Sequence, residues 1–523
     1  MDRLKQVFLL IAAFLWLGGP APAAASTRDY YMPFMHAKVG GSDGYGLQVV
    51  DSEDFSNIQQ ILDTSHVITQ AKLVYGGTLG EDGPSDVRPY AVVYATGGKW
   101  YRLDLRKSAS LTPIQISSES VVAPSSASVY CPTAVITTDP LAPQHSALLY
   151  QVPGPTGSCA NEYARMIRLD DAPTQAPTVT SIWSTLVYPI YDKNSRYYGL
   201  LSKPGNDLRY YASDFMTSVE IASDVTRFAY AATRPNGESV VLINSDLRRI
   251  KTNGKLIGEP LRTLPSEYRF ASSVNDGQEL FWYEDNTDSK KRSFWRTAMD
   301  GSSAPVNMYK TKEYLNEVRG FDLFTGVLSE KNLIFSHTVL DPTTSELRYE
   351  LYSMSKTAAS GVPAPVLVDS QKYGTAFVDD KRVYYNHGAY GSQAAHVAKD
   401  NGTPQSDFGA DTTFLAGPAD GSYIYRLPPR RYTHLILAQG INAGVYPYAK
   451  AKVKMYRLVD GAKIPLKQLP PKATSFSAGY AIGSPFLGTM GIDGADEIFA
   501  AEADSGEYRT ITNTKDISEV PIQ

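Results

Sequence analysis

Cysteine is nearly absent from this 523-residue chain, which contains only Cys131 and Cys159. Two thiols at this spacing cannot build a cysteine-based zinc site, and no Cys-x-x-Cys-His sequence is present, so covalent c-type haem is excluded. In an oxidising compartment we expect the two residues to form one structural disulfide, worth about 3 kcal/mol in the chain-entropy model. A pair of free, buried thiols is the alternative.

Signatures of metal, phosphate and nucleophile chemistry are also missing. The seven histidines include no His-x-x-x-His pair, and the chain has no phosphate-cradling loop and no calcium-binding loop. Gly40–Gly44 matches Gly-x-Ser-x-Gly in its letters, but a strand pattern follows instead of a helix, so we interpret it as a hairpin turn. His387 follows a predicted strand, in a loop where a surface histidine and a functional one are both open interpretations. We assign no catalytic residue, no metal and no cofactor.

A group of acidic residues offers one possible exception. Glu284, Asp285 and Asp288 carry the oxygen atoms that hard cations prefer as ligands. They lie in a wholly polar run from Glu284 to Arg292, between two apolar segments. Such a run is typical of a solvated hairpin loop, and this is the prediction; the cation site is the alternative.

Long apolar runs are lacking everywhere except near the N-terminus. Two basic residues precede the apolar stretch Val7–Leu17, and Ala21–Ala25 supplies small residues for cleavage. This layout predicts a secretory signal peptide over residues 1–25. A membrane anchor is the alternative, although the stretch is shorter than the about 20 residues that span a bilayer. If the signal peptide is removed, as predicted, the mature chain is expected to be periplasmic or extracellular. It would have no membrane span and no nucleic acid partner.

Strand and turn signals, by contrast, are abundant and repeat. Phe270–Tyr309 contains a polar turn at 275–277, an aromatic strand, a polar loop, a second strand and an Asp-Gly turn at 300–301. Gly277 accepts the positive φ of such a turn, and aromatic residues suit a pleated surface. The order of these segments predicts an antiparallel meander.

The same unit recurs along the whole chain. Strong copies have turns at 235–237, 379–380 and 493–494, and weaker ones centre on Tyr45, Val92, Leu148, Tyr197, Leu333 and Leu435. With the reference unit this makes ten candidates, spaced at roughly 40 to 60 residues, which is the range of four-stranded propeller blades. From about Pro235 onward the units resemble the blades of TolB-like propellers. The resemblance implies a fold and leaves the activity open.

We therefore predict an all-β fold: a single large β-propeller of four-stranded antiparallel blades over residues 26–523. Ten blades follow from the unit count, and seven or eight blades with insertions are the alternative. Ser26–Ala37 is apolar enough to be a strand and is predicted to close the ring by completing the last blade, beside Glu497–Ala503. Asp51–Thr69 has partial helical spacing and is interpreted as a short helix or a polar excursion between blades.

One segment differs from the rest in charge. Residues 426–472 carry ten Lys and Arg against the single Asp460, although the whole chain has a net charge of −4. Lys450, Lys452 and Lys454 alternate, so they share one face if they lie in a strand. Together with Arg430 and Arg431, they are the predicted binding residues for an anionic partner. A solvated face, or lysines that protect an edge strand from pairing, is the alternative.

Three functions are compatible with these observations. The first is a secreted, non-catalytic scaffold whose loops bind a protein or an anionic envelope polymer; the basic segment and the lack of a catalytic constellation favour it. The second is a carbohydrate-active enzyme, a lyase or hydrolase, with its acids gathered at the central channel. The third is a structural subunit of an envelope complex. We adopt the first as the prediction.

Overall fold

The computed structural model describes most of the chain between residues 29 and 521. The described residues are 29–38, 45–63, 68–80, 83–117, 133–136, 146–151, 164–169, 178–179, 187–191, 197–203, 206–212, 217–288, 291–311, 327–340, 347–388, 393–418, 432–440, 452–466, 473–477, 485–492, 495–511 and 517–521. The predicted signal peptide and both cysteines lie outside them.

The described residues form ten four-stranded antiparallel sheets, which we number as blades one to ten in chain order. Blade one contains β1 (Tyr31–Lys38), β2 (Tyr45–Asp51), β3 (Ile58–Leu62) and β40 (Ile517–Pro521). Blade two contains β4 (Ile68–Gly80), β5 (Gly83–Thr96), β6 (Lys99–Asp104) and β7 (Ile114–Gln115). Blade three contains β8 (Thr133–Ile136), β9 (Ala147–Gln151), β10 (Ala164–Arg168) and β11 (Thr178–Val179).

Blades four to seven follow the same order. Their strands are β12 (Val187–Tyr191), β13 (Tyr197–Ser202), β14 (Leu208–Ala212) and β15 (Ser218–Ala222); β16 (Phe228–Thr233), β17 (Ser239–Ile243), β18 (Asp246–Ile250) and β19 (Leu256–Thr263); β20 (Tyr268–Asn275), β21 (Glu279–Asn286), β22 (Lys291–Ala298) and β23 (Val306–Lys310); and β24 (Val327–Leu328), β25 (Asn332–Leu340), β26 (Leu347–Ser355) and β27 (Val366–Asp369).

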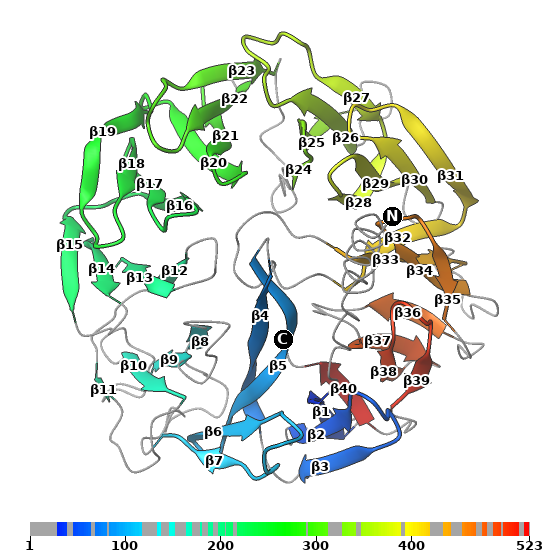
Figure 1. The fold of residues 1–523 in the computed structure, drawn as a ribbon. Coiled ribbons are helices and arrows are strands. Elements are labelled where there is room, and N and C mark those ends of the chain that lie inside the picture. The colour runs from blue at the N-terminus through cyan, green and yellow to red at the C-terminus, as the bar shows by residue number, and fades with distance from the viewer. Residues whose placement is uncertain are drawn as a thin grey trace, which may run out of the picture.

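Blades eight to ten complete the ring. Their strands are β28 (Lys372–Val378), β29 (Arg382–His387), β30 (Ala394–Lys399) and β31 (Pro404–Ala410); β32 (Thr412–Ala416), β33 (His434–Gln439), β34 (Lys452–Arg457) and β35 (Lys463–Pro465); and β36 (Ala473–Ser477), β37 (Phe486–Ile492), β38 (Ala495–Ala501) and β39 (Tyr508–Thr510). Figure 1 shows the blades side by side around a ring. The first strand of blades two to ten lies nearest the centre, and in blade one β40 takes that place.

The predicted all-β propeller is therefore confirmed, and every one of the ten predicted units corresponds to a four-stranded sheet. Blade six illustrates why the sequence folds in this way. Leu280 and Trp282 of β21 pack toward blade five, whereas the alternate residues Phe281 and Tyr283 pack toward blade seven. Because side chains of a strand point alternately to the two faces of a sheet, an unbroken apolar run buries both faces between neighbouring blades.

The ring closes differently from the prediction. The N-terminal strand β1 does not complete the last blade, since β36–β39 already fill it with contiguous chain. Instead β40 pairs antiparallel with β1 and completes blade one, with Phe34 opposite Pro521 and Lys38 opposite Ile517. The N-terminal strand meets the last blade only through packing, in which Phe34 lies in one apolar cluster with Ile498.

Two local predictions also need correction. Residues 58–62 form strand β3, so the partial helical spacing of Asp51–Thr69 does not produce a helix there. The polar run 284–292 is mostly strand, because β21 extends to Asn286 and β22 begins at Lys291, with Glu284 opposite Ser293. Polar side chains continue the ladder here because ion pairs to neighbouring strands satisfy them, as described below.

The two faces of the ring have different contents. In blades two to ten the first-to-second and third-to-fourth turns lie on one face, here called the turn face. The second-to-third turns and the connections to the next blade lie on the opposite face, here called the linker face. The repeated turns at 236–237, 275–277, 300–301 and 400–402 belong to the turn face.

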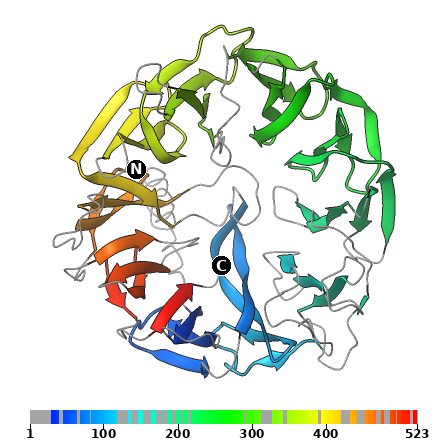
Figure 2. The same ribbon diagram turned by 180° about the vertical axis from the view of Figure 1, so that it is seen from behind.

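One hairpin departs from the common blade shape. β4 and β5, with 13 and 14 residues, extend from blade two toward the centre of the ring (Figures 1 and 2).

The described part of the chain contains no helix that is both long and apolar enough to cross a membrane.

Candidate functional site

A cavity of about 500 Å³ opens on the linker face where blades five and six meet. It lies at the start of the inner strands β16 and β20, and blade four contributes one lysine. The lining residues are Lys203, Thr226, Arg227, Phe228, Ala229, Leu242, Asn244, Ser245, Leu264, Pro265, Ser266, Tyr268, Arg269 and Phe270. Leu242 and Leu264 are buried, so the cavity has an apolar base beneath a polar rim.

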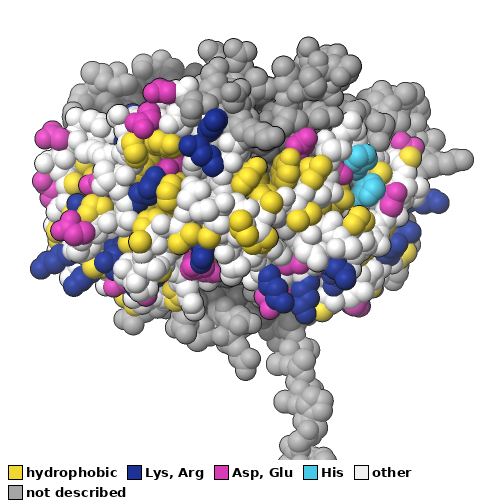
Figure 3. Space-filling model, turned by 90° about the horizontal axis from the view of Figure 1, so that it is seen from above, with side chains coloured by type: hydrophobic (Ala, Val, Ile, Leu, Met, Phe, Trp, Pro, Cys, Tyr) yellow, Lys and Arg dark blue, Asp and Glu magenta, His cyan; other side chains and the backbone are white. Residues whose placement is uncertain are grey.

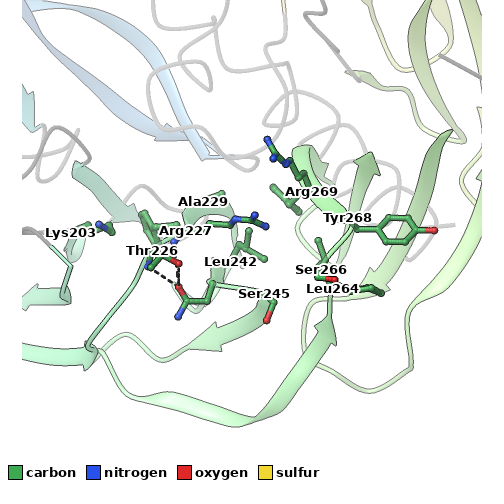
Figure 4. Close-up of a pocket in the computed structure, with 14 residues that line it drawn as sticks. Lys203, Thr226, Arg227, Ala229, Leu242, Ser245, Leu264, Ser266, Tyr268 and Arg269 are labelled. Atoms are coloured by element: carbon green, nitrogen blue, oxygen red, sulfur yellow. Dashed lines mark hydrogen bonds between the residues drawn. The ribbon is translucent and has the colours of Figure 1, made fainter. Parts of the chain in front are cut away.

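Asn244 fixes the cavity wall on the side of blade five. It follows β17 with a positive φ of 57°, a conformation that asparagine tolerates better than most residues. Its side-chain oxygen accepts hydrogen bonds from the backbone N–H of Thr226, at 2.8 Å, and of Arg227, at 3.3 Å. The Thr226 hydroxyl donates to the same oxygen at 3.1 Å (Figure 4). The segment that carries Arg227 is thus held in place by the second-to-third turn.

The charge of the cavity is of one sign. Lys203, Arg227 and Arg269 are basic, and the lining contains no Asp or Glu. Arg227 and Arg269 are exposed, and within the described residues neither forms an ion pair with a carboxylate. Figure 4 shows them extending from neighbouring blades into the same space. Two guanidinium forks beside an ammonium group suit carboxylate, sulfate or phosphate groups, which they can bind through charge-assisted hydrogen bonds.

A second polar group crosses blade eight on its face toward blade seven. Lys372 is opposite His387, Tyr385 is opposite His396, and His396 is opposite Asp407 in the strand register. Opposite residues of an antiparallel pair share a face, so the five side chains form a row across all four strands. Figure 3 shows a pair of neighbouring histidine side chains on the outer surface with acidic side chains beside them.

Blade seven contributes an acid to this row. Asp369 ends β27, and its Oδ2 lies 2.7 Å from Nδ1 of His387. The other carboxylate oxygen accepts the backbone N–H of Gln371 at 2.7 Å. Burial lowers the pKa of Lys372 to about 8, and the charge of Asp369 opposes this effect. The junction of blades seven and eight thus holds titratable groups beside its apolar cluster.

The basic segment predicted to bind an anionic partner is only partly described. Lys452 and Lys454 lie on one face of β34, as their spacing predicts, and Val453 and Met455 are buried on the other. Arg430, Arg431 and Lys450 lie outside the described residues. Other basic residues of the segment have partners: Lys463 lies over the ring of Phe408. The described part of the segment belongs to blade nine, and none of its residues lines the cavity between blades five and six.

Two of the three acidic residues considered for a hard cation, Glu284 and Asp285, form ion pairs. Glu284 forms an ion pair with Arg262 of β19, and Asp285 forms one with Arg292 of β22. These pairs use the carboxylates that a cation would need. Among the described residues, no group of three or more His, Cys, Asp and Glu side chains is arranged to hold a metal ion.

Sequence reasoning did not find the cavity. Arg227 and Arg269 are about one repeat apart, and neither belongs to a charged run. Only the stacking of successive blades brings equivalent positions together. His387 was open as a functional residue, but its partner Asp369 precedes it by 18 positions in another blade.

No protein-family model and no curated protein matches this chain. Solved structures do match in shape. A eukaryotic initiation factor is 10% identical over 93% of this chain and 97% of that one, with a TM-score of 0.40. The β-propeller domain of the trilobed protease from Pyrococcus furiosus is 9% identical over 74% of this chain and 100% of that one, with a TM-score of 0.31. Dipeptidyl peptidase 4 of Porphyromonas gingivalis is 10% identical over 83% of this chain and 65% of that one, with a TM-score of 0.36.

Proposed function

We propose that this protein is an exported, non-catalytic β-propeller scaffold that binds an anionic polymer in the cavity between blades five and six. One observation carries the proposal: three basic side chains from three blades line a single cavity that has no acidic lining residue. A polymer with regularly spaced carboxylate, sulfate or phosphate groups would place one group against the two arginines and continue over the exposed rim. Export is proposed from the signal-peptide pattern of residues 1–25.

A binding role agrees with the chemistry of this cavity better than catalysis does. Hydrolysis of a glycosidic bond uses a pair of carboxyl groups, one to protonate the leaving oxygen and one to activate water or attack. The cavity lining supplies neither. The TolB-like character of the repeats, proposed from their turn grammar, is compatible with binding and does not require an enzyme.

Charge reversal of the two arginines tests the proposal. We expect the Arg227→Glu/Arg269→Glu variant to lose at least about tenfold in affinity for polygalacturonate or polyphosphate, because two charge-assisted contacts become repulsive. The two probes separate a carboxylate preference from a phosphate preference. Binding to immobilised polymer, measured at low and high salt, reports the change, and added salt should weaken the wild-type interaction.

The chain offers a matched comparison for this experiment, at two of the lysines that the sequence predicts to bind an anionic partner. The Lys452→Glu/Lys454→Glu variant changes the net charge by the same amount on a strand of blade nine. Retained binding by this variant, together with loss in the arginine variant, supports the cavity as the site. Equal affinity of the wild type and the arginine variant would refute it, and equal losses in both variants would reduce the interaction to an effect of net charge.

A further inference from the structure

The two histidines in the polar row of blade eight are close neighbours. His387 ends β29 and His396 lies in β30, one diagonal step away on the same face of the sheet. Their ring centres are 5.4 Å apart and the ring planes are inclined by 66°. Tyr385 stacks on the His396 ring at 5.6 Å and limits the orientations available to it. The backbone ladder therefore presents two imidazoles at a fixed spacing.

The buried carboxylate of Asp369 defines the state of His387. Because Nδ1 lies 2.7 Å from Asp369 Oδ2, the ring proton belongs on Nδ1 in the neutral form, and Nε2 keeps its lone pair. The side chain of Asp369 is only 8% exposed, whereas that of His387 is 40% exposed. Nε2, the His387 nitrogen that does not face Asp369, therefore belongs to the more exposed of the two side chains. A carboxylate behind an imidazole is the arrangement that orients histidine ligands in metal sites and raises their basicity.

The other charged groups of the row complete the surroundings. Asp407 Oδ1 of β31 lies 3.8 Å from Nε2 of His396, which places a negative charge beside the second ring. Lys372 of β28 is opposite His387 and is buried, next to Asp369. Around the two imidazoles there are thus two carboxylates and one amine, and this balance favours a cation over an anion.

The spacing of the rings fits coordination to one ion. With metal–nitrogen bonds of about 2.1 Å and a tetrahedral angle, two imidazole ring centres stand roughly 5 Å apart. The observed 5.4 Å therefore needs little movement of the ring centres. We propose that His387 and His396 form an open, two-imidazole site for a divalent transition-metal ion, Zn²⁺, Ni²⁺ or Cu²⁺, with water in the remaining positions. Copper should bind most tightly, following the usual order of affinity.

This site is independent of the anion-binding function. It lies at the junction of blades seven and eight, whereas the basic cavity lies between blades five and six, and the two share no residue. Only two protein ligands are involved, which agrees with the lack of a three-ligand cluster among the described residues. We therefore expect moderate affinity, in the micromolar range, and exchange with added chelator.

Titration of the untagged protein with NiCl₂, ZnCl₂ and CuCl₂ tests the proposal. Calorimetry should give one ion per chain, and either His387→Gln or His396→Gln should weaken binding at least tenfold. Asp369→Asn should weaken it about 10- to 100-fold through loss of ring orientation. His66→Gln, at a histidine outside the row, is the control and should bind as the wild type does. The proposal would be overturned if His387→Gln and His396→Gln both bound metal as the wild type does. It would also be overturned if the wild type bound no metal at a 100-fold excess, roughly a saturating concentration for a micromolar site.

A spectroscopic measurement keeps the test decisive if a variant folds poorly. Electron paramagnetic resonance of the wild-type protein with one equivalent of Cu²⁺ counts nitrogen ligands directly. Coupling to two imidazole nitrogens supports the site, and coupling to one or none contradicts it. Circular dichroism of each variant confirms that a loss of binding is not a loss of fold.

Discussion

Arg262 of β19 and Glu284 of β21 form a two-point ion pair across the junction of blades five and six. The Arg262 Nη2–Glu284 Oε1 distance is 2.7 Å and the Nε–Oε2 distance is 3.1 Å. The guanidinium carbon also lies 3.8 Å from the centre of the Trp295 ring. The carboxylate is fully buried while the arginine remains partly exposed. This pair links the outer strand of blade five to a middle strand of blade six.

Removing the arginine should be costly for this reason. In Arg262→Ala the Glu284 carboxylate stays buried without its counter-ion, and we expect a loss of about 3–5 kcal/mol in the free energy of unfolding. Urea denaturation followed by fluorescence measures the change. The double variant Arg262→Met/Glu284→Leu should recover most of the loss, because it leaves no buried charge. If the double variant is as unstable as Arg262→Ala, lost packing and not an unpaired charge is responsible.

Lys372 should make stability depend on pH in the alkaline range. Burial lowers the pKa of Lys372 from 10.5 to about 8. Between these values the unfolded chain binds more protons than the folded one, so the contribution of Lys372 to stability rises with pH. We expect Lys372→Met to be more stable than the wild type at pH 7, and this difference to shrink by roughly 2 kcal/mol at pH 9.5.

The free energies of unfolding of Lys372→Met and the wild type are compared at each pH, because the many tyrosines affect the stability of both proteins alike. Burial raises the pKa of Tyr385 and Tyr508 to about 12, and such groups lower stability above pH 10 in both proteins. Lys381→Met is the control, since Lys381 is exposed in the turn before β29. A difference between Lys372→Met and the wild type that stays constant from pH 7 to 9.5 would contradict the expected protonation change.

Closure of the ring predicts a role for the extreme C-terminus. β40 joins blade one only through its ladder with β1, and without it blade one has three strands and an open edge. Deletion of 517–523 should therefore lower the thermal midpoint by several degrees, whereas deletion of 522–523 should leave it unchanged. Differential scanning fluorimetry is sufficient to compare the two. Equal midpoints for both truncations would mean that packing of β1 against β38 closes the ring without the strand.

The fold followed from the sequence because its signals are local. Each turn, such as Asn275–Gly277, and each apolar run between turns reports on a few adjacent residues, and ten repetitions reinforce the interpretation. How the ring closes depends instead on which terminal strand pairs with which blade edge. That pairing joins residues almost 500 positions apart, such as Phe34 and Pro521, and no local pattern reports on it.

The candidate sites depend even more on distant contacts. Lys452 and Lys454 were predictable as one face of a strand since their spacing alone decides it. The cavity needs Arg227 and Arg269 from successive blades, and the polar row needs register across four strands. No local pattern distinguishes these residues from ordinary surface charges.

Gly506 tests how tightly the turns of one blade fit against the next. It lies in the turn between β38 and β39 with a φ of 69°, and a Cβ atom there would overlap the carbonyl oxygen of Pro465 in blade nine. Gly97, between β5 and β6, has a φ of 55° and has no neighbour within 4 Å of such an atom. Gly97→Ala should therefore cost only the backbone term of about 1 kcal/mol. Gly506→Ala should cost about 1–3 kcal/mol more, since blade ten must move away from a backbone group that cannot rotate aside. Chemical denaturation of both variants measures the difference, and equal losses would show that the junction of blades nine and ten yields without strain.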